Sequence, residues 1–212
     1  MTASMDSKTQ SFVLRSTLTS PFGRKVRMAI DVLGLGDRIT LVPADTLDAS
    51  DTLRQQNPLG KMPCLLLADG SAIYDSGVII EFMQDVAGTD RLLPARGPAR
   101  FKALTLARLA DGITEAAILV VYEGRFRDPG MQSERWLTHQ RGKITRALAA
   151  FEASPPDAAK TDIVAIGLAC ALGYLDWRKP GEWRQACPRL TTWLAAFAKN
   201  EPAFERTRAQ AA

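Results

Sequence analysis

The sequence has no apolar run long enough to cross a membrane. Its longest one, from Ile163 to Leu172, has ten residues, whereas a membrane-spanning helix needs about 18 or more. The first ten residues, MTASMDSKTQ, also lack the basic and then apolar pattern of a secretory signal. We therefore interpret residues 1–10 as a flexible leader, or as a late start at Met5. We expect a protein that stays in the cytoplasm and has no membrane partner.

Cysteine and histidine are scarce as well. Cys64, Cys170 and Cys187 form no CxxC pair, and an odd number of cysteines argues against a secreted disulfide framework. The single histidine, His139, has no cysteine or carboxylate partner at the spacing of metal ligands. This pattern predicts reduced, mostly buried thiols and no metal site.

No basic stripe alternates with aromatic residues, as a nucleic-acid groove would require. The formal net charge is +4, and acids and bases are interspersed throughout the chain. We therefore expect no nucleic-acid partner, although a mildly positive field favours a small anionic ligand.

The chain does contain enough apolar residues, 46% of 212, for one large or two ordinary domains. Residues 11–88 alternate between strand and helix patterns, and they end in a short linker, 89–97, rich in glycine, proline and charge. The expected strands are 11–16, 39–44 and a hairpin over 63–74 that turns at Asp69-Gly70, and the expected helices are 20–35 and 76–88. The predicted order is β-α-β followed by ββ-α.

Residues 98–212 show no convincing strand pattern and predict an all-α domain. The expected helices lie near 98–127, 131–153, 159–175, 188–199 and 202–208. Pro188 and Pro202 fit the first turns of two of them, where a missing N–H costs nothing. The stretch IVAIGLACAL is apolar on every face, so it should form the central buried helix of the bundle.

Pro63 interrupts the pattern, because it opens an apolar strand although proline cannot donate to a sheet ladder. A β-α-β-ββ-α domain with a proline at this place resembles the thioredoxin-like fold, in which that proline is cis. The resemblance implies that the backbone N–H and C=O of Met62 turn outward and pair with an extended peptide ligand. The alternative is a trans proline at the start of an edge strand.

Residues 11–205 as a whole resemble the cytosolic glutathione transferases. The stretches that carry the resemblance are SPFGRKVR, NPLGKMP and YDSGVIIEF in the first domain, and LADGI and GYLDWR in the second. The last two are most similar to a bacterial subgroup often called YibF-like. The resemblance implies a thioredoxin-like N-terminal domain, an all-α C-terminal domain, a homodimer, and glutathione as co-substrate without a metal. The strand-to-helix corner carries Ser20 and Gly23 where a dithiol oxidoreductase has two cysteines, so a dithiol cycle is excluded.

The resemblance also assigns residues to each part of glutathione. Asp75 would bind the ammonium, and Ser76 with its N–H would bind the γ-glutamyl carboxylate at a helix N-terminus. The main chain of Met62 would hold the cysteinyl unit beside Pro63, and Lys61 would meet the glycyl carboxylate. The alternatives are that Asp75 or Ser76 is a plain N-cap and that Lys61 is an ordinary loop lysine.

Ser20 is the expected catalytic residue. Its hydroxyl would donate a hydrogen bond to the glutathione thiolate at the N-terminus of the first helix, since an alcohol is too weak to act as a base. The neighbouring hydroxyls of Ser16, Thr17 and Thr19 are alternatives, and a plain N-cap role for Ser20 is compatible with the catalytic one.

The second substrate is expected to be an apolar electrophile bound in a cleft between the domains. Tyr122 and Phe126 lie four residues apart on one helix face, next to Arg125, and Phe22 lies at the strand-to-helix corner. They are candidate substrate contacts, although aromatic residues at helical spacing are more often core. The resemblance further implies that Glu115 reaches the glutathione ammonium of the partner subunit.

The buried helix departs from the family pattern at its start. The family has Ser or Thr three residues before an Asp, and this chain has Asp162 but Ala159. Thr161 or Asp157 is therefore the expected cap.

Two other functions remain open at this point. The same thiolate would serve a glutathione-dependent reductase of disulfides or peroxides. A non-catalytic, protein-binding relative is less favoured, because this chain retains Ser20, Lys61 and the Asp75-Ser76 pair.

Overall fold

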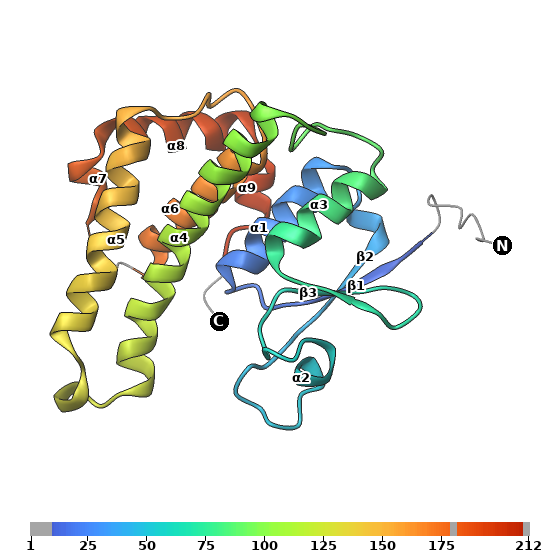
Figure 1. Cartoon of the computed structure of the whole chain (residues 1–212), viewed down its shortest axis with the longest axis horizontal. Helices are drawn as coiled ribbons and strands as arrows, with labels where there is room; N and C mark the ends of the chain where they lie inside the picture. Colours follow the sequence, from blue (N-terminus) through green and yellow to red (C-terminus); the bar gives the residue numbers. More distant parts are fainter. Residues whose placement is uncertain (1–9, 179–181, 210–212) are drawn as a thin grey trace. The chain divides into compact units, whose positions relative to one another are not determined.

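The computed structural model describes residues 10–178 and 182–209, which divide into two compact units (Figure 1). The first unit contains the described residues up to Leu92 and those from Thr207 onward, and the second runs from Leu93 to Arg206. The predicted leader falls almost entirely outside the described residues. Thr207, which follows the last helix, lies in the first unit, where the Arg27 guanidinium donates to its carbonyl oxygen at 3.1 Å.

The first unit is built on one mixed sheet with the predicted order of elements. Its elements are β1 (Phe12–Arg15), α1 (Pro21–Val32), a 3-10 turn (Gly36–Arg38), β2 (Ile39–Val42), α2 (Leu53–Gln56), β3 (Cys64–Leu66), β4 (Ala72–Ile73) and α3 (Ser76–Val86). The strand order is β2-β1-β3-β4, with β1 and β2 parallel and the other two pairs antiparallel. The thioredoxin-like prediction is confirmed, except that the short helix α2 was not expected.

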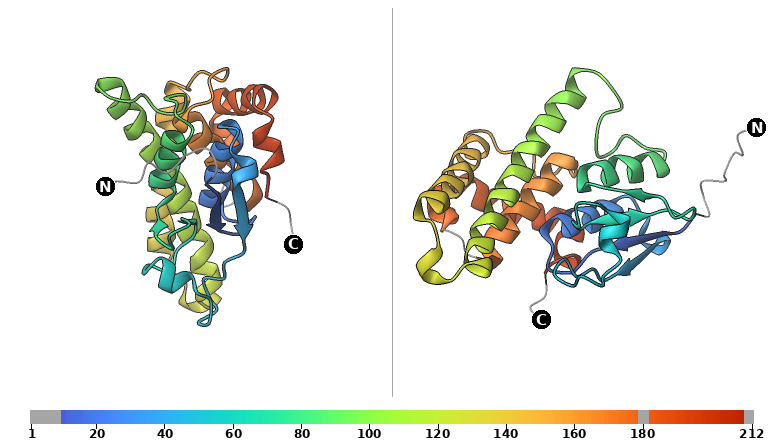
Figure 2. Two further views of the ribbon diagram at one scale, coloured as in Figure 1. Left: turned by 90° about the vertical axis from the view of Figure 1, so that its right-hand side faces the viewer. Right: turned by 60° about the horizontal axis from the view of Figure 1, so that its bottom comes forward.

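The two faces of this sheet bury different side chains, because neighbouring residues of a strand point to opposite sides. Phe12 and Leu14 are buried on the face that α1 and α3 cover (Figures 1 and 2), and the ring of Phe12 meets that of Phe82 on α3 edge-on at 5.7 Å. Cys64 packs on the other face with Leu53 of α2. The sheet therefore carries a helix layer on each side.

The second unit is all helical, as predicted. Its elements are α4 (Pro98–Phe126), a 3-10 turn (Pro129–Met131), α5 (Glu134–Ala153), α6 (Ile163–Arg178), α7 (Trp183–Ala186), α8 (Pro188–Asn200) and α9 (Ala203–Arg206). Long helix α4 packs against both α5 and α6, and it runs side by side with α5 in the views of Figures 1 and 2. No helix within the described residues is both long and apolar enough to span a membrane.

The buried helix α6 begins four residues later than the sequence suggested. All residues from Ile163 to Leu172 are buried, which confirms its central position. Its cap is Asp162 itself, whose carboxylate accepts from the N–H groups of Val164 and Ala165 at 3.0 Å each. The expected caps were wrong, since Thr161 donates instead to Glu201.

Candidate functional site

Three of the predicted site segments meet at one edge of the sheet. Arg15, the last residue of β1, pairs with Cys64, the first residue of β3. Ile73, at the end of β4, pairs with Leu65 near the start of β3. The end of β1, the start of β3 and the end of β4 therefore lie at the same edge. The segments that follow or precede them, around Ser20, Met62-Pro63 and Asp75-Ser76, gather there.

Ser20 is the N-cap of α1. Its backbone is extended (φ −72°, ψ 121°), and its hydroxyl oxygen accepts from the Gly23 N–H at 3.1 Å. Pro21 follows at the first helical position, where proline is pre-organised for a helix. Ser20 is half-buried, and no acceptor for its hydroxyl hydrogen is found among the described residues. The cap geometry thus leaves the O–H available to a ligand.

The neighbouring hydroxyls are arranged differently. Ser16 is fully buried, and a Cβ added at Gly23 would lie only 2.0 Å from its Oγ, so the glycine is required by this contact. The hydroxyl groups of Thr17 and Thr19 bond to each other at 3.1 Å, and that of Thr17 also lies 3.5 Å from the Met62 sulfur. Of these alternatives, Ser16 is buried, and Thr17 contacts Met62. Met62 belongs to residues 57–63, the loop that ends at Pro63, which we call the proline loop.

The proline loop is fixed by Asn57, which sequence reasoning missed. The Asn57 side chain is 2% exposed, donates to the Lys61 carbonyl oxygen at 2.8 Å and accepts from the Leu59 N–H at 3.1 Å. The Met62–Pro63 peptide is cis, so the trans alternative was wrong. Met62 precedes the first paired residue of β3, which places its backbone outside the ladder. Lys61 is exposed.

Cys64 follows this loop, but its own thiol is not suited to act as a nucleophile. Its side chain is fully buried, and burial raises the pKa of its thiol above the ordinary value. All three cysteines are free and buried, as predicted.

Asp75 is the N-cap of α3, and Ser76 is the first residue of that helix. One Asp75 carboxylate oxygen accepts from the N–H groups of Gly77 and Val78, at 2.9 and 3.4 Å. The Tyr74–Asp75 peptide is also cis. Asp75 therefore does cap α3, and its role toward a ligand stays a prediction. Of the first three N–H groups of α3, that of Ser76 is not engaged by the cap.

A buried arginine holds α2, the helix that precedes the proline loop. Arg15 is 6% exposed, and its guanidinium donates to four groups at 2.7 to 3.1 Å, on Asp51, Gln56, Thr52 and Pro43. The pKa of Asp51 lies below its usual value, mainly because its carboxylate accepts from the backbone N–H groups of Asp45 and Leu53. The hydrogen bond and charge of Arg15 lower it further. This network positions the helix that precedes Asn57.

The second unit gathers aromatic and cationic side chains near the ends of α4 and α6. The rings of Tyr122 and Phe126 meet edge-on at 5.2 Å, and Arg125 lies 5.4 Å from the Tyr122 ring centre. Tyr122 and Phe126 are 36% and 57% exposed, so the alternative of a core role was wrong. Glu115 is exposed on α4.

Two further members of this group, on α6, were not foreseen. Tyr174 is buried, and this burial is the main cause that raises the pKa of its hydroxyl. The neighbouring Arg178 lowers that pKa, and smaller effects come from Tyr122, which raises it, and from Arg125, which lowers it. The Arg178 guanidinium stacks 3.6 Å above the Trp177 ring. The packing of α4 against α6 brings these residues close to Tyr122 and Arg125. Because they are far apart in the sequence, the sequence pattern did not predict this grouping.

The remaining predictions concern Phe22 and metals. Phe22 is half-buried on α1, with the Lys25 ammonium 5.5 Å from its ring centre. Within the described part of the chain, no group of three His, Cys, Asp or Glu side chains is placed to hold a metal ion.

Comparison with known proteins gives a consistent result. Residues 19–86 match the glutathione S-transferase N-terminal domain family. The chain is 34% identical over 201 residues to the uncharacterized GST-like protein YibF of Escherichia coli, with 89% of this chain and 98% of YibF covered.

Solved structures extend the likeness to nearly the whole chain. A glutathione transferase family member from Pseudomonas fluorescens with bound glutathione has a TM-score of 0.88 and 41% identity, with 95% of this chain and 100% of that chain covered. A glutathione S-transferase from Methylobacterium radiotolerans in complex with glutathione sulfonate has a TM-score of 0.84 and 31% identity, with 95% and 96% covered.

Proposed function

Because the chain belongs to the glutathione S-transferase family, we propose that it binds glutathione, stabilises its thiolate with Ser20 and conjugates it to an electrophile. The observation that carries this proposal is the meeting of the Ser20 cap, the cis-proline loop and the start of α3 at one sheet edge. Solved relatives that bind glutathione give it independent support.

Each part of the tripeptide has a matching group at this edge. The Ser76 N–H and hydroxyl receive the γ-glutamyl carboxylate, where the helix dipole adds to the attraction. The Asp75 carboxylate binds the ammonium while it caps α3. The backbone of Met62, beside Pro63, pairs with the cysteinyl unit like an added strand, and the exposed Lys61 meets the glycyl carboxylate.

The chemistry lies in the ionisation of the glutathione thiol. A free thiol has a pKa near 8.5, and lowering it by about two units stabilises the thiolate by roughly 2.7 kcal/mol. The Ser20 hydroxyl supplies part of this by donating to the sulfur at the N-terminus of α1. The thiolate then attacks the electrophilic carbon, a carbon–sulfur bond forms, and the leaving group departs with the electron pair of its bond.

The second substrate is bound by the exposed residues Tyr122, Arg125 and Phe126 of α4. Their rings favour an apolar body, and the guanidinium favours an acidic substituent on it. A relative from Pseudomonas fluorescens, 40% identical, binds S-(propanoic acid)-glutathione, a conjugate that carries such an acid. An Arg125→Gln variant should raise KM for 4-chloro-3,5-dinitrobenzoate but not for its methyl ester.

The proposed enzyme is a cytoplasmic homodimer, in which Glu115 contacts the glutathione ammonium bound by the partner subunit. The free, buried cysteines are consistent with a reducing compartment, and Glu115 is exposed on α4. Light scattering measures the molar mass in solution, which should be that of two chains. A Glu115→Gln variant that stays dimeric should bind glutathione more weakly.

The deciding experiment compares electrophiles. Turnover of 1-chloro-2,4-dinitrobenzene with glutathione, above the uncatalysed rate and lost on removal of Ser20, would support the transferase. Faster turnover of a mixed disulfide or a hydroperoxide would assign the thiolate to a reductase instead. Glutathione binding without either reaction would identify a non-catalytic relative.

A further inference from the structure

The end of α4 carries the three candidate substrate residues but has very little buried surface of its own. Among residues 122–126, all of which the structure describes, four are exposed and only Glu123 is buried. The buried apolar residues of α4 lie between Ala107 and Ala117. Glu123 is 2% exposed, and no step proposed above uses it. The last turn of α4 therefore depends on a polar contact more than on apolar burial.

Glu123 joins this turn to the start of α5, across the short connection that Figure 1 shows between the two helices. One oxygen of its carboxylate accepts from the backbone N–H of Ser133 at 2.9 Å, and the other accepts from the guanidinium of Arg127. Ser133 is the N-cap of α5, and its hydroxyl oxygen accepts from the N–H of Trp136 at 3.3 Å. The residue that begins α5 is thus bonded to the buried residue at the end of α4. Both carboxylate oxygens have a partner, as a buried charge requires.

The two contacts of the Glu123 carboxylate are unequal. The Arg127 side chain is 54% exposed, so water screens its charge and weakens the ion pair. The bond from Ser133 joins a backbone donor to a charged acceptor, and such bonds are roughly twice as strong as neutral ones. It also spans ten positions of the sequence, whereas Glu123 and Arg127 lie four apart. The bond from Ser133 is therefore the contact that fixes one helix to the other.

The three candidate substrate residues lie on the same helix turn as Glu123. The rings of Tyr122 and Phe126 meet edge-on at 5.2 Å, and Arg125 lies 5.4 Å from the Tyr122 ring centre. Because these side chains are exposed, their own packing does not fix the turn that carries them. We propose that Glu123 is a positioning residue, which holds Arg125 and the two rings in place for the second substrate. This inference rests on the proposed function.

The main test replaces Glu123 by Ala and measures KM for 4-chloro-3,5-dinitrobenzoate and for its methyl ester at saturating glutathione. If Glu123 holds Arg125 in place, its removal weakens the contact between Arg125 and the acid group. KM for the acid should rise about ten-fold, the effect of one lost charge-assisted contact, and KM for the ester should rise less. The dissociation constant for glutathione should stay the same.

Two further variants separate positioning from a general loss of stability. In the double variant Glu123→Ala, Arg125→Gln, KM for the acid should be close to that of Arg125→Gln alone, because either change removes the same contact. Glu123→Gln gives up the pair with Arg127 but keeps an oxygen for the N–H of Ser133. It should therefore restore most of the wild-type preference for the acid.

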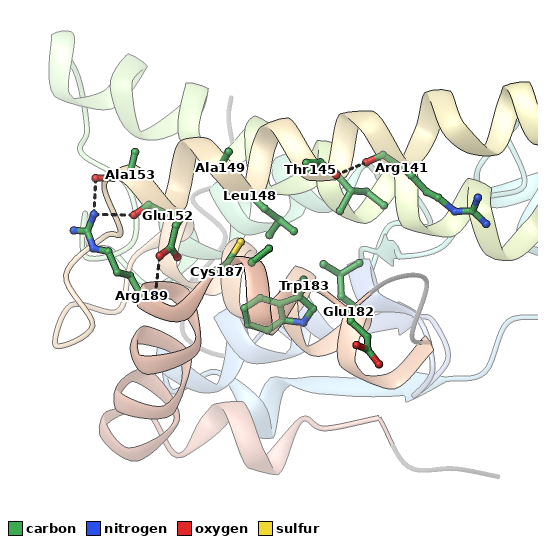
Figure 3. A pocket seen from close by; sticks show the side chains of 13 residues that line it. Arg141, Thr145, Leu148, Ala149, Glu152, Ala153, Glu182, Trp183, Cys187 and Arg189 are labelled. Carbon is green, nitrogen blue, oxygen red and sulfur yellow. Dashed lines mark hydrogen bonds between the residues drawn. The ribbon is translucent and has the colours of Figure 1, made fainter.

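The matched control is Glu134→Ala, which removes a carboxylate from the same junction. Glu134 is the first residue of α5, and it pairs at 3.4 Å with Arg141, whose side chain is drawn in Figure 3. The side chains of this pair are 79% and 48% exposed, so the pair contributes little. This variant makes no change at the end of α4 and should keep the wild-type KM for both substrates.

Amide hydrogen exchange tests the contact without any turnover. In Glu123→Ala, the backbone N–H groups of residues 122–127 should exchange faster, because the last turn of α4 opens more often. Glu134→Ala should leave their exchange unchanged. Unaltered exchange in a folded Glu123→Ala protein would overturn the idea that Glu123 holds this turn.

The kinetic results decide the role toward the substrate. If Glu123→Ala and Arg125→Gln raise KM for the acid independently, so that their effects multiply in the double variant, the positioning role is refuted. A wild-type protein that turns over neither substrate would refute the proposed function and, with it, this role. Hydrogen exchange would then still show whether Glu123 holds the end of α4, so the two failures are distinguishable.

Discussion

Replacing Asn57 by Ala should weaken glutathione binding, although Asn57 is not among the proposed ligand contacts. The substitution removes a donor to the Lys61 carbonyl oxygen and an acceptor from the Leu59 N–H, at 2.8 and 3.1 Å. Each neutral hydrogen bond contributes about 0.5 to 1.5 kcal/mol. Both bonds are only partly buried, and their joint loss should cost about 1 to 3 kcal/mol of stability.

The same energy appears in affinity if the loop must be ordered for Met62 to receive the ligand. The dissociation constant for glutathione should then rise about five- to 150-fold, which corresponds to about 1 to 3 kcal/mol. Isothermal titration calorimetry measures it, and thermal denaturation measures stability in parallel. Asn57→Asp keeps an acceptor for Leu59 but sets a carboxylate oxygen against the Lys61 carbonyl oxygen, and this repulsion should make it bind as weakly as Asn57→Ala.

The matched control is Asn200→Ala in the second unit. Asn200 also donates from its side chain to a backbone oxygen, that of Ala158 at 3.3 Å, but it is exposed. This variant should keep its glutathione affinity. A folded Asn57→Ala protein with unchanged affinity would refute the idea that Asn57 orders the binding loop.

The other variants test separate parts of the site. Gly23→Ala places a Cβ 2.0 Å from the Ser16 oxygen, so unfolding free energy should fall by about 1 to 3 kcal/mol, and Ser16→Ala in the same chain should restore part of it; a melting temperature unchanged by Gly23→Ala would contradict the contact. Asp75→Asn keeps the cap but loses the charge, so calorimetry should show glutathione affinity lower by about 1.5 to 3 kcal/mol, and full retention on a glutathione column would count against the role. Two backbone N–H groups and then Arg15 lower the pKa of Asp51; because its folded-state value lies below its unfolded value, near 3.9, wild type should exceed Asp51→Asn in stability above about pH 4 and lose this advantage as the pH falls. Denaturant titrations across that range would disprove this if the difference stayed constant.

The regular parts of the fold were predictable because local signals agree with tertiary packing. The hairpin turn at Asp69-Gly70 is one case, since Gly70 has φ 84° and the Asp69 carboxylate accepts from the Ser71 N–H at 2.9 Å. The helix α6 is another, because its residues are apolar all round and all buried from Ile163 to Leu172. In both, sequence pattern and burial lead to the same structure.

The features that sequence missed depend on long-range polar contacts. Helix α2 has only four residues and no periodicity, and it is held by Arg15, which lies 36 to 41 positions away from its three side-chain partners. Nothing in the sequence pattern distinguishes Asn57 from an exposed loop residue, although the structure buries it. The cap of α6 was misassigned because a three-residue spacing suggested a capping box, whereas Asp162 caps the helix directly.

The site was predicted in part for the same reason. Ser20 and Asp75 could be identified because each cap position precedes a clear helical pattern. Tyr174 and its neighbour Arg178 could not, since the proximity of Tyr174 to Tyr122 comes from the packing of α6 on α4.

The most direct test is an ultraviolet titration of the glutathione thiolate in the complex. In the wild-type protein the bound thiol should ionise about two units below its free pKa of about 8.5. Ser20→Ala should return that pKa toward the free value while glutathione affinity stays nearly intact, and Thr19→Val, which removes a neighbouring hydroxyl, should leave the pKa low. An identical titration curve for the wild-type and Ser20→Ala complexes would contradict the account.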